Sequence, residues 1–94
     1  MQSITTGRLG AHQSVAYTGT AGTITNAISD SIRAVRVVTT SAAYIVIGKT
    51  PTATTAGVYM PADRPEVFNC NPGEKVSAIQ VSAGGSLHVT ELDH

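Results

Sequence analysis

The chain has 94 residues and a mass of 9.7 kDa, a size that suits one compact domain. Six basic and six acidic side chains give a formal net charge of zero. This balance argues against a nucleic-acid-binding domain, which normally carries a clustered basic excess. No apolar run approaches the length of a membrane-spanning helix and no secretory signal pattern opens the chain, so no membrane partner is expected.

Small domains are often stabilised by a disulfide or by a bound metal ion, and the composition predicts neither. Cys70 is the only cysteine, so no disulfide can form within the chain. His12, His88 and His94 lie far apart in the sequence and lack the spacing of a zinc site, so we expect no metal and no other cofactor. A small, weakly charged domain of this kind is often stabilised by association. These features favour a subunit of an assembly over a monomeric enzyme.

The apolar residues are mainly β-branched. Valine and isoleucine together number 17 against 3 leucines, and there are 13 threonines. Such side chains suit the pleated surface of a strand and lose rotamer freedom in a helix. Residues 1–12 are polar and contain Gly7 and Gly10, so they are expected to form an N-terminal arm. Residues 13–94 are expected to form a single β domain.

The chain divides into seven or eight short predicted strands. They cover residues 13–17, 23–27, 32–40, 42–48, 58–60, 66–69, 75–81 and 86–92. A helix over residues 25–38 is the alternative reading there, but its β-branched content favours a strand. The apolar run Tyr44–Ile47 is typical of a strand covered on both faces, and residues 49–57 are expected to form a loop.

The last two predicted strands flank Ser82-Ala83-Gly84-Gly85 and are therefore expected to pair as a hairpin. Asn71-Pro72-Gly73 before them is a strong turn signal. Turn signals recur at roughly 8–12 residues, which is the spacing of small all-β domains. The expected fold is thus a small antiparallel β-sandwich or a jelly-roll-like barrel.

No set of side chains predicts catalysis. The three histidines are the only bases of the usual type. Asp30, Asp63, Glu66 and Glu74 lie in or beside predicted turns, which favours a charged loop rim. Gly19 and Gly22 lack the Lys-Ser/Thr pair of a phosphate-binding loop, and Gly84-Gly85 is accounted for by the hairpin turn. Cys70 is expected to be a packed thiol rather than a nucleophile. We therefore expect no catalytic residue.

Four residues are expected to contribute to an interface. Tyr59 precedes a proline-bounded loop that contains Arg64, and tyrosine and arginine are enriched at protein interfaces. His88 alternates with Leu87 and Val89, which directs it to solvent or to a subunit contact. Arg8 lies in the predicted arm. Phe68, on the other side of the same loop, is expected to pack in the core.

The second half of the chain resembles small virion proteins of tailed bacteriophages. The resemblance lies in residues 49–54 (KTPTAT), 59–68 (YMPADRPEVF), 71–80 (NPGEKVSAIQ) and 84–92 (GGSLHVTEL), and it extends over roughly residues 32–92. It implies a capsid decoration, or cement, protein: a compact β domain, commonly trimeric, that binds the major capsid protein on the outside of the head shell. The expected location is therefore the virion surface, after assembly in the host cytoplasm.

Other functions remain open at this level. A head–tail junction or tail component is built from the same kind of β sequence. A small ligand- or carbohydrate-binding module on a fibre is a further alternative, although surface aromatic residues are scarce. An enzyme is the third reading, and it would need a partner chain to complete its site.

Overall fold

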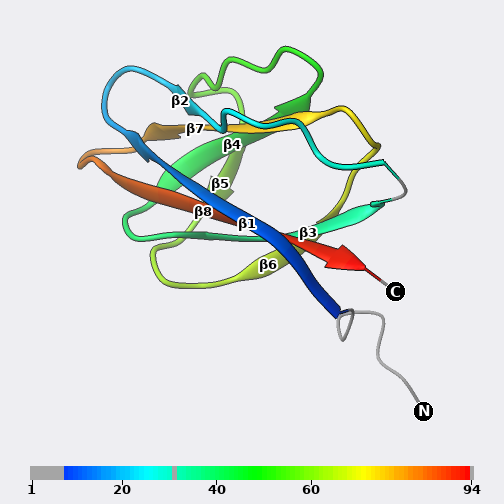
Figure 1. Cartoon of the computed structure of the whole chain (residues 1–94). Coiled ribbons are helices and arrows are strands. Elements are labelled where there is room, and N and C mark those ends of the chain that lie inside the picture. Colours follow the sequence, from blue (N-terminus) through cyan, green and yellow to red (C-terminus); the bar gives the residue numbers. More distant parts are fainter. Residues whose placement is uncertain (1–7, 31, 94) are drawn as a thin grey trace.

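The computed structural model describes residues 8–30 and 32–93 (Figure 1). Within these residues there are eight strands and no helix, so the predicted all-β class is confirmed and the helical reading of residues 25–38 is not. The strands are β1 (Arg8–Tyr17), β2 (Gly22–Thr23), β3 (Ala34–Thr39), β4 (Ala43–Gly48), β5 (Val58–Met60), β6 (Glu66–Asn69), β7 (Lys75–Gln80) and β8 (Gly85–Asp93).

The strands form two antiparallel sheets of four strands each, packed as two layers (Figure 1). Sheet A has the order β1-β8-β3-β6, and sheet B has the order β2-β7-β4-β5. A long antiparallel ribbon that folds over on itself contains four strand pairs, and all four are present here: β1–β8, β2–β7, β3–β6 and β4–β5. This is the strand order of a jelly roll, one of the two architectures predicted from the sequence.

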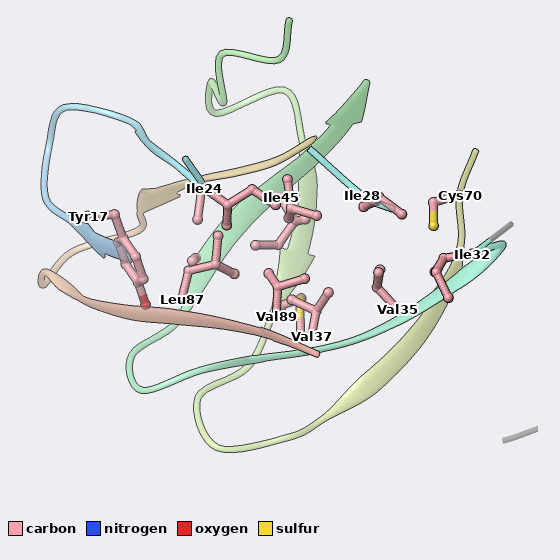
Figure 2. Close-up of a cluster of buried hydrophobic side chains, with 14 residues drawn as sticks. Tyr17, Ile24, Ile28, Ile32, Val35, Val37, Ile45, Cys70, Leu87 and Val89 are labelled. Carbon is pink, nitrogen blue, oxygen red and sulfur yellow. The ribbon is translucent and has the colours of Figure 1, made fainter. Parts of the chain in front are cut away.

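The core lies between the inner faces of the two sheets (Figure 2). Because side chains alternate along a strand, Val35 and Val37 of β3 face inward, as do Leu87 and Val89 of β8. Sheet B contributes Ala43, Ile45, Met60, Val76 and Ala78 to the same cluster. Figure 2 shows Tyr17 at one end of this cluster and Cys70 with Ile32 at the other.

The connection from β2 to β3 contributes buried side chains to the core although it is not a regular strand. We expected a strand over residues 23–27, but regular pairing covers only Gly22 and Thr23. Beyond them, Ile24 and Ile28 donate backbone hydrogen bonds to Val76 and Glu74, at 3.0 and 2.8 Å, and both side chains are buried. The connection therefore covers one margin of the core without continuing the ladder.

Strand β1 begins earlier than expected. It starts at Arg8, so residues 8–12, which the sequence assigned to the arm, are paired with β8, while residues 1–7 lie outside the described residues. Leu9 is opposite Leu92 and His12 is opposite Thr90, so the register shifts by one residue between these pairs. Such a shift is a β-bulge: Gly10 and Ala11 have no register partner, and the pairing resumes at His12.

The predicted hairpin of the last two strands is wrong. Strand β7 pairs with β2 and β4 in sheet B, whereas β8 pairs with β1 and β3 in sheet A, so residues 81–84 cross between the sheets. The turn does not explain the glycine at position 85, but the space around it does. A Cβ at this position would lie 2.6 Å from Thr40 Oγ1 and 2.9 Å from the Tyr17 hydroxyl oxygen. The glycine thus permits the β3–β4 turn and the end of β1 to pack against β8.

Candidate functional site

The structure describes the side chains of three of the four expected interface residues. Tyr59 lies in β5 on the outer face of sheet B, and His88 lies in β8 on the outer face of sheet A. Arg64 is exposed in the connection between β5 and β6. Arg8 is paired with Asp93 in the β1–β8 ladder, and its side chain lies outside what the structure describes. Tyr59 and His88, which lie on different sheets, therefore do not belong to one site.

Tyr59 belongs to an apolar area on the outer face of sheet B, which we call the sheet B patch and define as Tyr44, Tyr59, Ile79 and Val81. Tyr44 is the cross-strand neighbour of both Tyr59 and Ile79. The two tyrosine rings meet edge to face, with centroids 6.1 Å apart, an arrangement that aromatic pairs prefer. Tyr59 is 54% exposed and Val81 is 40% exposed. The patch is thus a structured apolar surface that remains open to solvent.

The sheet edge beside the patch is also open. Strand β5 is the last strand of sheet B and pairs only with β4 among the described residues. Val58 in this strand is 59% exposed. An edge strand presents unpaired backbone N–H and C=O groups, which a strand of another chain can bind. Pro61, immediately after β5, limits how far such pairing extends.

The rest of the outer face of sheet B is covered by the β4–β5 loop. Pro51 and Ala53 of this loop are buried. The Ala53 backbone N–H donates to the Ser77 hydroxyl at 3.0 Å, and the Thr23 hydroxyl lies 3.0 Å from the same oxygen. Ser77 is consequently fully buried although it points away from the core. This cover reaches Val46 of β4, against which Gly57 of the loop packs, and it leaves the sheet B patch with Tyr44 uncovered.

The second candidate surface is the outer face of sheet A. His12 and His88 come from the neighbouring strands β1 and β8 and lie on the same face. Their rings are stacked, with centroids 5.8 Å apart and planes 14° from parallel. His12 Nδ1 is 2.9 Å from the Thr90 hydroxyl oxygen. Arg36 of β3 is the cross-strand neighbour of Thr90, on the side away from His12.

The expectation for Cys70 is confirmed, because its thiol is free and buried. Burial is the main cause that raises the pKa of this thiol to about 11, and the carboxylates of Glu74 and Glu91 add to it while Arg33 opposes them. A thiol with a raised pKa remains protonated near neutral pH and is a poor nucleophile. Cys70 therefore acts as a packing residue at one end of the core.

Sequence reasoning singled out Tyr59 and His88 as candidates but did not single out the residues beside them. Tyr44 was hidden in an apolar run that resembles a strand covered on both faces. His12 was assigned to the arm, so its position beside His88 was not foreseen. The alternation of β8 did indicate the outward direction of His88, but only the register with β1 identifies its neighbour. Strand pairing between distant segments was the missing information.

Among the residues that the structure describes, no pocket opens and no three His, Cys, Asp or Glu side chains converge as they would around a metal ion. The described residues also contain no helix that is long and apolar enough to cross a membrane. Comparison of the chain with models of known protein families, with curated proteins and with solved structures finds no match in any of the three.

Proposed function

We propose that this protein is a decoration (cement) subunit of a tailed-bacteriophage capsid. It binds the major capsid protein on the outside of the head shell, assembles as a homotrimer and stabilises the virion without catalysing a reaction. Binding to the assembled lattice, but not to its dissociated form, stabilises the shell by mass action.

The observation that carries the proposal is the sheet B patch beside the open edge of β5. Exposed apolar residues on a small domain mark protein-interaction surfaces when they are contiguous. Here two aromatic side chains are held in a fixed geometry, and rigid aromatic residues contribute strongly to interfaces because little rotamer entropy is lost on binding. The patch provides apolar surface that a partner can bury, and the adjacent strand edge provides backbone groups for directional hydrogen bonds.

The fold and the sequence resemblance support the same function independently. Jelly rolls are found in viral capsid proteins, and also in lectins and cupins, so the architecture is compatible with several functions. The resemblance over residues 32–92 favours the virion among these. The zero net charge fits a protein that contacts other protein surfaces rather than nucleic acid.

The first experiment measures the copy number of this chain relative to the major capsid protein in purified particles, by quantitative mass spectrometry. We expect a ratio close to parity, because a decoration protein occupies the whole lattice. A ratio many times lower would overturn the decoration function and favour a head–tail junction or tail component. Absence from the particles would overturn both.

The second experiment tests the surface. Purified protein is mixed with particles stripped of it, and binding is measured by co-sedimentation for the wild type, Tyr59→Ser and Val67→Ser. Val67 is a matched control because it is exposed and apolar but lies in β6 of the other sheet. We expect Tyr59→Ser to weaken binding at least about tenfold, as expected for an aromatic anchor, and Val67→Ser to have little effect. Equal losses of binding in the two variants would show that the capsid contact does not depend on the sheet B patch.

A further inference from the structure

Two of the three histidines, which the sequence separates, lie side by side in the folded chain. His12 is opposite Thr90 and His88 is opposite Ser14 in the β1–β8 ladder, so the two imidazoles are diagonal neighbours on one face. His12 is exposed and His88 is partly exposed. Solvent and dissolved ions therefore reach both rings.

The distance between the rings fits one shared metal ion. An imidazole nitrogen binds Zn²⁺ at about 2.0–2.1 Å, so two rings on one ion have centroids roughly 5–6 Å apart, depending on the angle at the metal. The observed separation is 5.8 Å. The rings are nearly parallel, so sharing one ion requires one ring to turn about its χ2 angle until a nitrogen of each ring faces the ion. Rotation about this bond is soft, and among the described residues His88 makes no side-chain hydrogen bond that opposes it.

The Thr90 hydroxyl supplies the contact that usually orients a metal-binding histidine. When His12 Nδ1 carries the proton and donates it to Thr90 Oγ1, at 2.9 Å, the lone pair is on Nε2. Histidines that bind metals almost always donate their other ring N–H in this way, and the partner holds both the tautomer and the ring orientation. The arrangement prepares Nε2 of His12 as a ligand.

We propose that His12 and His88 form a surface site for a divalent transition-metal ion such as Zn²⁺. The two imidazoles occupy two coordination positions, and water fills the others. The positive charge of Arg36, on the far side of Thr90, lowers the affinity, so removing that charge is expected to strengthen binding.

The site goes beyond the proposed capsid function and gives β1 a second attachment. Strand β1 is an edge strand that pairs only with β8 among the described residues, and its register is interrupted by a bulge next to His12. An ion held by both strands binds the folded state more tightly than the unfolded chain and therefore stabilises this pairing.

The test uses the full chain without an affinity tag, because a histidine tag would bind the same ions. Zn²⁺ is titrated by calorimetry, and the imidazole resonances of His12 and His88 are followed by NMR. We expect one ion per chain, shifts at both histidines, and a Tm that rises with the Zn²⁺ concentration. Absence of binding up to millimolar Zn²⁺ would overturn the proposal.

Four variants separate the site from general affinity for zinc. His12→Gln and His88→Gln are each expected to weaken binding at least about tenfold, since one of two protein ligands is lost. His94→Gln, which removes the remaining histidine, is expected to leave binding unchanged, and Arg36→Gln to strengthen it. Circular dichroism without zinc checks that each variant is folded. Binding that survives His88→Gln, or is lost in His94→Gln, would overturn the proposal.

Discussion

The buried carboxylate of Glu91 accepts two hydrogen bonds from Ser29. Its Oε2 lies 2.9 Å from the Ser29 backbone nitrogen and 3.0 Å from the Ser29 hydroxyl oxygen. Glu91 is only 6% exposed and occupies an inward position of β8, opposite Val35. The pair thus fixes the β2–β3 connection to sheet A, next to the point where Ile28 enters the core. Two polar groups set the position of an apolar segment that has no regular strand to hold it.

Removing the Ser29 side chain and removing the Glu91 side chain are both expected to destabilise the fold, but by different amounts. Ser29→Ala removes one hydrogen bond to a charged group but retains the backbone N–H bond, so we expect a loss of about 1–2 kcal/mol in the free energy of unfolding. Glu91→Ala leaves both Ser29 donors without their acceptor and creates a cavity, so we expect about 2–4 kcal/mol. Urea denaturation measures both values.

The control for this pair is Ser82→Ala, in the exposed β7–β8 connection, which is expected to change stability little. The double variant Ser29→Ala/Glu91→Ala is expected to cost less than the sum of the single changes, because the shared bond can be lost only once. Simple additivity would show that the two side chains do not act together.

Local signals in the sequence were sufficient for most strand boundaries. The predicted strands at residues 58–60 and 66–69 coincide with β5 and β6, because Pro61 and the Asn71-Pro72-Gly73 turn interrupt the chain near them. The inward positions of Leu87 and Val89 in β8 also follow from alternation alone. These features depend on neighbours in the sequence, and such neighbours are visible without a structure.

Pairing between strands could not be predicted in the same way. The segment Ser82–Gly85 has the composition of a hairpin turn, but it also suits a crossing between two sheets. The choice depends on Tyr17 and Thr40, which pack against Gly85 from distant parts of the chain. The same limitation hid the neighbour of His88, since the β1–β8 register involves opposite ends of the chain.

Gly85→Ala is expected to destabilise the fold by about 1–3 kcal/mol, because a Cβ there would lie 2.6 Å from Thr40 Oγ1 and force the turn to move. Gly48→Ala is the matched control. Gly48 is also at the end of a strand, and a Cβ there would meet no atom within 4 Å. We expect that change to be neutral or stabilising by up to about 1 kcal/mol. Thermal denaturation compares the two, and equal effects would refute the role given to packing at Gly85.

The Cys70 thiol is expected to react slowly with a disulfide reagent at about pH 8, because its pKa in the folded chain is about 11. Reaction in concentrated guanidinium chloride should be much faster. The folded pKa lies above the ordinary value of 9.0, so folding favours the neutral thiol. This contribution to stability is present below pH 9.0 and is lost as the pH rises toward 11.

The control for the thiol is the variant Cys70→Ala/Ala83→Cys, which moves the cysteine to the exposed β7–β8 connection. We expect its thiol to react at nearly the same rate in the folded and unfolded states. If native Cys70 reacted as fast as this exposed thiol, its burial at the end of the core would be contradicted.

Ser77→Ala tests whether the β4–β5 loop is held on sheet B by a single hydroxyl. The change leaves the Ala53 N–H without its acceptor and removes the neighbour of the Thr23 hydroxyl, so we expect a loss of about 1–3 kcal/mol. Hydrogen exchange of the Ala53 amide should accelerate more than that of the amides in β7, because the loop opens without unfolding of the sheet. Thr52→Ala, an exposed change in the same loop, is expected to alter neither quantity. An Ala53 amide that remained protected in Ser77→Ala would show that the loop is held without the Ser77 hydroxyl, by the burial of Pro51 and Ala53 and by the Thr23 hydroxyl, which lies 3.4 Å from the Pro51 carbonyl oxygen.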